Sequence, residues 1–481
     1  METHKKQISS FFTIPEPDSR PFKEKISEFC STSTMHGLKI VGCHTTHIVR
    51  RILWLIAVTA CFLFILTMLI VLMIKVHNPG TQTDISINTL EVGEGLQLPA
   101  ITICSYNQYT LEYLKTAEGI RNWLFLSKLY PDIIPYTDFE NLTGLEFNVS
   151  SYRENISNVL EVIRDASFNL TSSLKACSWN GQIQQCSSLP GTRTVFTDFG
   201  VCYSINYSND SSYIIKVPGA RQGIMIFAFD SFESYIFGEN FGSLGFRILV
   251  HDPFEYPSVK QFGISVQPSI DTTIALKKNI YQFREGNGCQ KRVPQLIGYK
   301  RYTENGCMAE CVANCVYHKC SCKLFFQSGD YLICNSPESV QCARRSEKLC
   351  WTRRDYLQSC NCPLECEHIE YENRISIANY PSLSYKNLFS VLIPNTSLSE
   401  LSRNAIKMTI YYEDLNVVTF IQSDSYTAEQ IFGDIGGQMG LFLGASVLTI
   451  AEFCDFIIFA LIDKIRCYFK SKKIVNIFQM S

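Results

Sequence analysis

The chain lacks the features that mark several common protein classes. Its 481 residues contain no glycine-rich phosphate loop with acidic partners and no set of nucleophile and base, which argues against an enzyme. The formal net charge of −2 gives no indication of a nucleic-acid partner. No fixed-period repeat, low-complexity tract or long linker is present. The informative features are therefore the apolar segments and the cysteines.

Histidine is scarce, with eight residues, whereas cysteine is abundant, with 21. Only His318 and His368 lie near the dense group of cysteines between residues 289 and 366, so zinc is a weak alternative there and we predict no metal site. Disulfides formed in an oxidising compartment are the favoured interpretation. Cys307, Cys311 and Cys315 recur at helical spacing, which predicts one face of a helix stapled to a later strand or helix.

Charge is absent from two apolar segments. Residues 52–74 run for 23 residues without a charge, about 34 Å of helix, which is long enough to cross a bilayer and begins too late for a cleaved signal peptide. The second segment has 17 uncharged residues between Asp434 and Glu452, or about 26 Å of helix. Both carboxylates are therefore expected near the membrane edges or facing water.

Basic residues flank both segments on the side away from the long loop. By the positive-inside rule these clusters are cytosolic: Lys39, Arg50 and Arg51 before the first segment, and Lys464, Arg466, Lys470, Lys472 and Lys473 after the second. Sixteen cysteines and all the Asn-x-Ser/Thr sequons fall in the loop between, and we expect glycosylation at Asn141, Asn148, Asn155, Asn169, Asn206, Asn209 and Asn395.

The predicted organisation is that of a multi-pass plasma-membrane protein with both termini in the cytosol. Its parts are a cytosolic region (1–51), a first membrane helix (52–75), an extracellular domain (76–430), a second membrane helix (431–462) and a cytosolic tail (463–481).

The second apolar segment is unusual for a membrane anchor because residues 433–446 contain five glycines and acidic residues lie at both ends of the segment. Gly436, Gly440 and Gly444 recur every four residues and would share one face of a helix. A helix that lines a water-filled pore accommodates both glycine and charge. A glycine-rich anchor that packs against a neighbouring helix is the alternative, and we prefer the pore.

The extracellular domain has the pattern of an α+β fold. Strand-like runs and helical patterns alternate with turn residues. Strands are expected at 224–229, 246–251, 406–412 and 417–422, and helices at 119–128 and 157–165.

Together these motifs resemble the epithelial sodium channel, degenerin and acid-sensing ion channel superfamily, and within it most closely the bile acid-sensitive members. The matching segments extend along the whole chain: His36-Gly37, Leu98 to Cys104, Phe196 to Tyr203, the dense cysteine group, Tyr411-Tyr412-Glu413, and Gly436 to Ser446. Each motif alone is weak, but their order and spacing are specific. An ATP-gated trimeric channel shares the topology but lacks the Gly-Ala-Ser segment and the cysteine group.

The resemblance implies a homotrimer with palm, knuckle, β-ball, finger and thumb subdomains outside the membrane. It implies that Gly444, Ala445 and Ser446 form the Na⁺-selective constriction, with Gly436 and Gly437 also lining the pore. It places Asp434 at the outer mouth, Glu452 and Asp455 along the inner pathway, Gly440 at the amiloride position, and Gly433, His36 and Gly37 in gating.

Each role has a structural alternative. Asp434 could stabilise a helix N-terminus, and Asp455 could offset the basic tail. Ser446 could hydrogen-bond to its own helix, and His36 could be an ordinary juxtamembrane histidine. Phe22, Ile26 and Phe29 share one face of a cytosolic segment, which is either an interfacial helix or a disordered tail.

The resemblance also implies a disulfide pairing. Its seven pairs are Cys104–Cys202, Cys177–Cys186, Cys289–Cys366, Cys307–Cys362, Cys311–Cys360, Cys320–Cys342 and Cys322–Cys334. Cys315 and Cys350, which acid-sensing members lack, remain, and we predict an eighth bridge between them across the thumb.

Two departures from the acid-sensing pattern affect the expected ligand. Arg344 and Lys348 occupy thumb positions where acid-sensing channels carry aspartates, so proton sensing by paired carboxylates is not expected there. At the expected contact between thumb and first span, Gly286-Asn287-Gly288-Cys289 lacks a tryptophan and Val76-His77-Asn78 lacks a tyrosine.

We therefore predict an amiloride-sensitive, sodium-selective channel gated by bile acids or similar amphiphiles, without a cofactor. Na⁺ is the permeant ion, and three copies of Asp434 make Ca²⁺ binding at the outer mouth plausible. Expected partners are membrane lipid, other copies of the chain and other subunits of the family. The alternatives are an auxiliary subunit or receptor without a current of its own and, in a different class, a two-span ectoenzyme.

Overall fold

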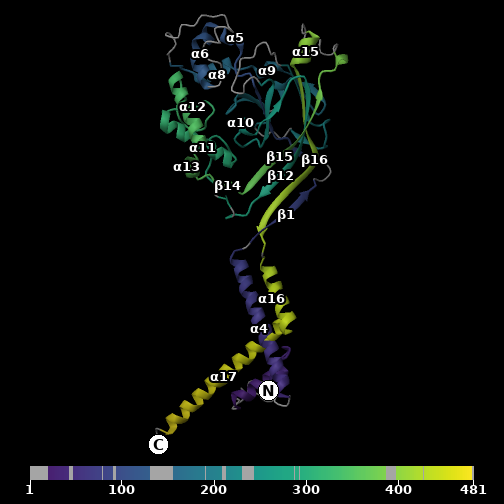
Figure 1. Cartoon of the computed structure of the whole chain (residues 1–481), viewed down its shortest axis with the longest axis vertical. Coiled ribbons are helices and arrows are strands. Elements are labelled where there is room, and N and C mark those ends of the chain that lie inside the picture. The colour runs from purple at the N-terminus through teal and green to yellow at the C-terminus, as the bar shows by residue number, and fades with distance from the viewer. Residues whose placement is uncertain are drawn as a thin grey trace, which may run out of the picture. The chain divides into compact units, whose positions relative to one another are not determined.

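The computed structural model describes residues 20–42, 47–78, 80–89, 94–130, 155–189, 191–207, 213–229, 243–286, 288–291, 293–385, 397–425 and 427–478, with side chains up to residue 465. The chain divides into two compact units, which are described separately. One consists of residues 1–82 together with 424–481, and the other of Thr83–Ser423 (Figure 1).

The larger unit is built on a seven-stranded sheet in the order β15-β12-β16-β9-β4-β5, with β1 paired to β16. Its strands are β1 (Thr81–Asn88), β4 (Leu174–Trp179), β5 (Gln182–Gln184), β9 (Ile224–Phe229), β12 (Ile270–Gln282), β15 (Glu367–Asn379) and β16 (Ala405–Asp424). The central strand β12 pairs in parallel with β16 and antiparallel with β15. β16 is the last strand before the second apolar segment.

A second, five-stranded sheet has the order β11-β10-β3-β7-β6. Its strands are β3 (Ala100–Ser105), β6 (Arg193–Thr197), β7 (Gly200–Ile205), β10 (Phe246–His251) and β11 (Ile264–Val266). Ile101 and Ile248 of this sheet are fully buried in one hydrophobic cluster with Ile226 and Ile410 of the first sheet. Burial of these β-branched side chains therefore joins the two sheets into one core.

Helices form a second core in the same unit. They are α5 (Leu111–Leu114), α6 (Ala117–Leu129), α8 (Val159–Ala166), α11 (Glu304–Cys320), α12 (Pro337–Thr352) and α13 (Arg354–Ser359). Leu126, Ile163, Val316 and Val340 are fully buried together, so α6 and α8 pack against the pair α11 and α12. Thr303 and Ser336 cap α11 and α12 by accepting hydrogen bonds from backbone N–H groups.

The described residues contain eight disulfides, in the pairing that the resemblance and the leftover cysteines imply. The eighth, Cys315–Cys350, joins α11 to α12. Each bridge is expected to add about 2–4 kcal/mol by restricting the unfolded chain.

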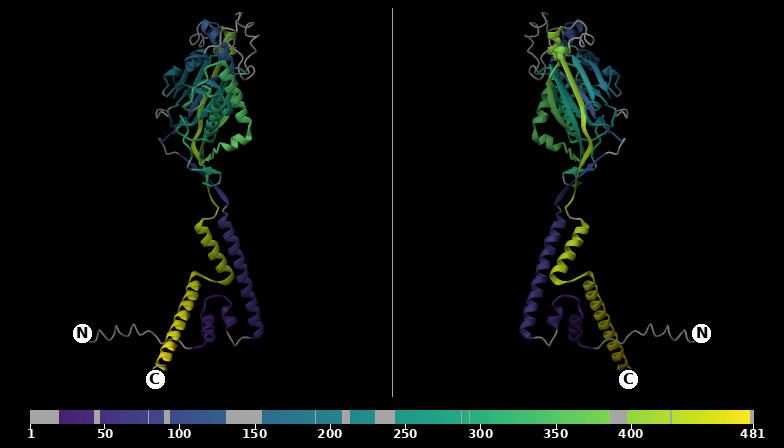
Figure 2. Two further views of the ribbon diagram at one scale, coloured as in Figure 1. Left: turned by 90° about the vertical axis from the view of Figure 1, so that its left-hand side faces the viewer. Right: turned by 90° about the vertical axis from the view of Figure 1, so that its right-hand side faces the viewer.

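The smaller unit consists of helices α2 (Phe22–Thr32), α3 (Leu38–Gly42), α4 (Ile48–His77), α16 (Ala428–Leu443) and α17 (Val447–Phe478). Within the described residues, α4 alone is a single helix long and apolar enough to cross a membrane, with a mean hydropathy of 3.0. α16 and α17 pass the same test only as a pair, bent by 78°. Figure 2 shows α16 running beside α4 before the chain turns into α17.

The remaining elements are short. They are β2 (Leu96–Gln97), β8 (Ile214–Ile215), β13 (Cys289–Gln290), β14 (Leu364–Glu365), α9 (Leu170–Ser173), α10 (Val259–Phe262), α15 (Leu398–Asn404) and two 3₁₀ turns, η2 (Cys186–Ser188) and η4 (Leu383–Tyr385).

Candidate functional site

The second apolar segment is not one continuous helix. α16 ends at Leu443, Gly444 adopts a left-handed conformation with φ 61°, and α17 begins at Val447. The N–H groups of Gly444 and Ala445 donate to the carbonyls of Gly440 and Met439, which closes the end of α16. The break therefore coincides with Gly444, Ala445 and Ser446, the residues expected to form the constriction. Gly444 lies outside α16, so the single helical face predicted for three glycines includes only Gly436 and Gly440.

His36 and Gly37 lie directly against this break. The His36 N–H donates to the Leu443 carbonyl at 3.1 Å. A Cβ placed on Gly444 would overlap the His36 ring at its Nδ1 atom. Gly37 has φ +82°, and a Cβ there would meet Trp54 and Val58 of α4 at 2.9 Å. Glycine is thus required at both positions, by backbone conformation and by space.

A hydroxyl network connects the His-Gly segment to the start of α17. Thr34 Oγ1 and Thr449 Oγ1 are 2.7 Å apart, and the Thr34 N–H donates to Glu452 Oε2 at 3.2 Å. Ser446 and Thr449 bond reciprocally, because each backbone N–H donates to the other side-chain oxygen. The Ser446 hydroxyl therefore caps its own helix, as the structural alternative anticipated.

Thr34 and Thr449 were not identified from the sequence. The available signal was the spacing of Ser446 and Thr449, because a hydroxyl residue followed three positions later by a second side-chain acceptor is typical of a helix N-terminus. Recognising it would have indicated a new helix start at residue 447.

The glycines of α16 face open space within the chain. A Cβ added to Gly433, Gly436, Gly437 or Gly440 would meet no atom within 4 Å in the described part of the protomer. α16 instead contacts α4 through larger side chains, including Phe442, whose ring centroid lies 4.7 Å from that of Phe64. A glycine-rich anchor packed on its own neighbouring helix does not account for this geometry.

The acidic residues take different positions along the two helices. Asp434 lies in the second turn of α16 and is exposed, and Asp455 is exposed on α17. Glu452 is half-buried and accepts the two Thr34 hydrogen bonds. The structure brings Glu452, but not Asp434, to the His-Gly segment.

The aromatic residues of the segment predicted to be cytosolic lie on a helix, α2, that packs on α17. The Phe29 ring stacks on Phe456 with centroids 4.5 Å apart and meets Phe453 edge-on at 4.8 Å. Lys25 Nζ lies 2.8 Å from Asp463 Oδ2, and both side chains are largely buried. Of the two alternatives for this segment, the structure contains a helix, and its aromatic face contacts protein.

Arg344 occupies one of the positions at which a proton sensor of the acid-sensing type is expected to carry an acidic residue, and its charged side chain is buried. The Arg344 side chain is 6% exposed, and its Nη1 lies 3.0 Å from Glu347 Oε2. Its guanidinium carbon lies 5.4 Å from the Tyr130 ring and 5.2 Å from the Phe326 ring. Arg344 thus joins α12 to the end of α6, whereas Lys348 is exposed.

Two carboxyl groups elsewhere in the larger unit have raised pKa values. Burial raises the pKa of Glu255 to about 7, against the hydrogen bond from the Asp252 N–H, which lowers it, while the charge of Asp252 raises it. Burial raises the pKa of Asp198 to about 6, against a hydrogen bond and the charge from Lys260. Asp252 and Glu255 lie in a turn, with the Asp252 N–H donating to Glu255 Oε1 at 3.1 Å.

The described sequons differ in exposure. Asn155 and Asn169 are exposed. Asn206 is 0% exposed, and its Nδ2 donates to the Leu98 carbonyl at 2.6 Å, so its amide is not presented for glycosylation. The sequons at Asn141, Asn148, Asn209 and Asn395 lie outside the described residues, as does Asn287. Within the described ranges, no group of three or more His, Cys, Asp or Glu side chains is placed to hold a metal ion.

Comparison with known proteins gives one family along most of the chain. Residues 29–456 match the sequence model described as amiloride-sensitive sodium channel. Acid-sensing ion channel 2 of Mus musculus is 27% identical over 448 residues, covering 90% of this chain and 86% of the relative. Acid-sensing ion channel 4-B of Danio rerio is 26% identical over 466 residues, covering 93% and 78%.

The bile acid-sensitive ion channel of Homo sapiens is similar to the same degree, at 25% identity over 457 residues, covering 92% of this chain and 87% of the relative. Among solved structures, a proton-activated chloride channel aligns with a TM-score of 0.29 at 8% identity, covering 86% of this chain and 95% of that chain. A likeness that weak carries no argument about fold or function.

Proposed function

Because this chain belongs to the amiloride-sensitive sodium channel family, whose members are ion channels and not enzymes, we propose that it is a pore-forming subunit of a sodium-selective, amiloride-sensitive channel in the plasma membrane. Both termini are cytosolic, and Thr83–Ser423 lies outside the cell. α4 is the first span, and α16 with α17 forms the second.

The observation that carries this proposal is the break at Gly444, Ala445 and Ser446. Irregular backbone at membrane depth is tolerated only where it is buried in protein or lines a water-filled cavity, because each unsatisfied peptide group in lipid costs several kcal/mol. Three copies of this break around an axis would present backbone carbonyls to a partly dehydrated Na⁺. The turn that contains His36 contacts the break from the proposed cytosolic side, through the hydrogen bond from the His36 N–H to the Leu443 carbonyl.

We propose the homotrimer that the family resemblance implies, because the geometry of one protomer calls for further copies of the chain. One chain with two spans cannot enclose a pore, and the glycine face of α16 has no neighbour in the described protomer. Gly436, Gly437 and Gly440 would line the pathway, Gly440 in the amiloride position. Asp434 would form an acidic ring that concentrates cations and binds Ca²⁺ weakly. Other family subunits could replace one or more copies.

Bile acids or similar amphiphiles are the proposed ligands. Arg344 supports this over protons, because a guanidinium fixed between two rings cannot act as one half of a carboxylate pair. A large acid-evoked current abolished by substitution of Arg344 or Lys348 would contradict the proposal. An auxiliary subunit without a current of its own is the alternative within the same family.

Protons acting elsewhere are the second candidate ligand. The raised pKa values of Asp198, about 6, and of Glu255, about 7, put two buried carboxyl groups in the range that mild acid would titrate. Current evoked by acid alone and lost in Asp198→Asn or Glu255→Gln would favour this alternative.

Binding of Cd²⁺ to a cysteine introduced at the break tests whether the break lines a pore. Cys30, Cys43, Cys61, Cys454 and Cys467 are first replaced by serine in a chain opened by Gly433→Phe. Externally applied Cd²⁺ should then block the current of Ser446→Cys but not that of the control Leu53→Cys, whose parent side chain is 63% exposed on α4. Failure of Cd²⁺ to affect the Ser446→Cys current would contradict a pore at this position.

A further inference from the structure

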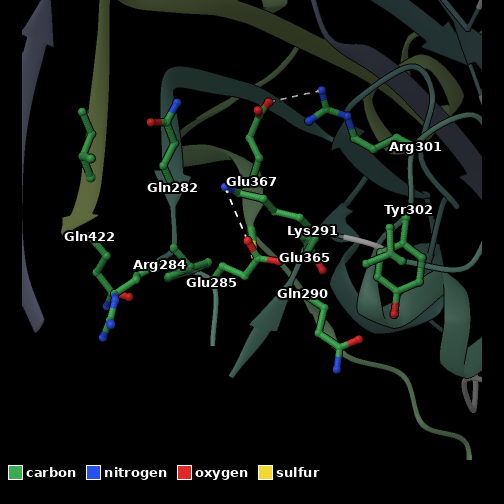
Figure 3. A pocket seen from close by; sticks show the side chains of 14 residues that line it. Gln282, Arg284, Glu285, Gln290, Lys291, Arg301, Tyr302, Glu365, Glu367 and Gln422 are labelled. Carbon is green, nitrogen blue, oxygen red and sulfur yellow. Dashed lines mark ion pairs between the residues drawn. The ribbon is translucent and has the colours of Figure 1, made fainter. Parts of the chain in front are cut away.

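The larger unit contains a pocket of about 730 Å³ at the end of β12 (Figure 3). Its lining comes from four parts of the chain: the residues that leave β12, the segment leading into α11, the start of β15 and the end of β16. We call it the β12 pocket, after the strand whose last residue, Gln282, forms part of its wall. Its volume lies within the range of small-molecule sites, about 300–1,000 Å³.

The wall of the β12 pocket is a preformed part of the sheet. Gln282 of β12 pairs with Glu367 of β15 and with Ile421 of β16, so three adjacent strands supply one row of lining residues. The disulfide Cys289–Cys366 ties β13 to the segment between β14 and β15, and the Phe283 N–H donates to the Cys366 carbonyl at 2.8 Å. Little ordering of this wall is needed when a ligand binds.

Most charged side chains that line the pocket already form ion pairs or hydrogen bonds within the protein. Glu365 lies 2.8 Å from His368 Nδ1 and accepts the Glu304 N–H at 2.9 Å. Arg301 is held between Asp252 and Glu367, each at 3.7 Å. These groups position the wall and do not select a ligand.

One ion pair at the pocket is exchangeable. Lys291 Nζ lies 3.5 Å from Glu285 Oε2, with the side chains 71% and 56% exposed. A solvent-exposed pair of this kind contributes about 0–1 kcal/mol, so Lys291 can exchange Glu285 for an anionic ligand at small cost. Arg284 lies on the same side of the pocket, next to Gln422 in Figure 3.

The rest of the lining favours an apolar ligand body with a hydrogen-bond donor. Phe283, Val293, Tyr302 and Ile421 supply apolar surface, and Ile421 is 37% exposed. Gln422 Oε1 is buried and accepts no hydrogen bond from the described residues. A buried carbonyl without a donor costs about 1–3 kcal/mol, which the Gln422 side chain would recover by turning toward a ligand hydroxyl in the pocket.

We propose that the β12 pocket binds a hydroxylated amphiphilic organic anion, with its acid group at Lys291 and a hydroxyl at Gln422. This inference rests on the proposed channel function and names where its ligand acts. Ile421 and Gln422 lie near the end of β16, and only residues 425–427 separate that strand from α16. A ligand in the pocket therefore acts on the strand that leads directly into the second span.

Binding of radiolabelled cholate tests the proposal. The full chain is purified in lipid nanodiscs, cholate is kept below its micellar range, and binding to empty nanodiscs is subtracted. Lys291→Gln should weaken binding about fivefold, and Glu285→Gln should strengthen it about two- to threefold, because the competing carboxylate is gone. Lys319→Gln, an exposed lysine on α11 away from the pocket, is the matched control and should leave binding unchanged.

The variant Gln422→Leu shows whether loss of binding comes from the missing contact with a ligand hydroxyl or from distortion of the pocket. It should weaken cholate about fivefold and leave unchanged the binding of cholanate, which has the same carboxylate but no hydroxyls. Equal cholate affinity in wild type, Lys291→Gln and Gln422→Leu would overturn the assignment of this pocket, as would parallel losses for both ligands.

Current recorded in parallel keeps the two proposals apart. Cholate-evoked current that survives Lys291→Gln and Gln422→Leu would retain the channel function and overturn the pocket. Pocket-dependent binding without current, from protein present at the cell surface, would support the pocket and contradict gating by this ligand.

Discussion

At the scale of single residues, Arg344 shows how one substitution changes the chemistry of a site. Its guanidinium is buried between Tyr130 and Phe326 and paired with Glu347. The sequence indicated that a cation occupies an acidic slot, but not that the cation is a packed element of the core. The direction and burial of a long side chain depend on neighbours, here α6 and the segment after α11, that are distant in the chain.

Breaking the Arg344–Glu347 pair should destabilise the larger unit. Arg344→Met is expected to lower its free energy of unfolding by about 3 kcal/mol, because Glu347, 16% exposed, is left as an unpaired buried charge. Arg344→Met with Glu347→Gln should recover most of the loss. Thermal unfolding of the purified full chain measures both, and equal destabilisation in the single and double variants would show that the charge pair is not the cause.

Glu255 predicts a dependence of stability on pH. Burial raises its pKa from 4.5 to about 7. Between those values the native state holds a proton that the unfolded state has released, so the contribution of Glu255 to stability falls as pH rises. Glu255→Gln should therefore unfold at a higher temperature than wild type at pH 8, by about 3 kcal/mol in stability, and at the same temperature near pH 4. A constant difference at both pH values would contradict this assignment.

At the scale of elements, the strands with continuous apolar patterns were predictable. β9 and β10 begin and end at the expected residues, 224–229 and 246–251. The segments 406–412 and 417–422 are instead one strand, β16, because the charged residues between them fall at a shift of register against β12 and not at a turn. Asp414 accepts the Asn416 N–H there, a local bond that the sequence pattern does not show.

The break in the second apolar segment was not predictable from hydropathy. The uncharged run continues from Ile435 to Ala451 without interruption, whereas the backbone leaves the helix at Gly444 by adopting a left-handed conformation. A glycine in an apolar helix is compatible with either a helical or a left-handed conformation, and here a Cβ on the left-handed Gly444 would overlap the His36 ring. The spacing of Ser446 and Thr449, which form the cap of α17, was the local sign of a break.

The packing of α2 on α17 gives a prediction at this scale. With Cys30, Cys43, Cys61, Cys454 and Cys467 replaced by serine, Phe29→Cys and Phe453→Cys should be joined by a short bifunctional thiol crosslinker, because the centroids of the parent rings are 4.8 Å apart. Lys25→Glu should reduce that crosslinking severalfold by opposing Asp463, and adding Asp463→Lys should restore it. Crosslinking on denaturing gels is the readout, and yields unaffected by either charge change would show that the ion pair does not hold α2 in place.

At the scale of the whole molecule, the fold combines a larger unit that holds eight disulfides with a smaller, helical unit whose second apolar segment is broken. The order and spacing of the motifs along the chain indicate the family, and the match over residues 29–456 shows it. The proposed pore depends on the break, because the break places irregular backbone in an apolar segment. The central claim is that copies of this chain form a conducting pore without other subunits.

Voltage clamp of cells expressing Gly433→Phe tests that claim most directly. Gly433 has open space around it in the described protomer, so the substitution is expected to fold, and by the family resemblance to hold the pore open. The account predicts a standing current, blocked by amiloride, that reverses at a more positive potential in external Na⁺ than in external K⁺. Absence of current from glycosylated protein at the cell surface, or equal reversal potentials in the two solutions, would contradict it.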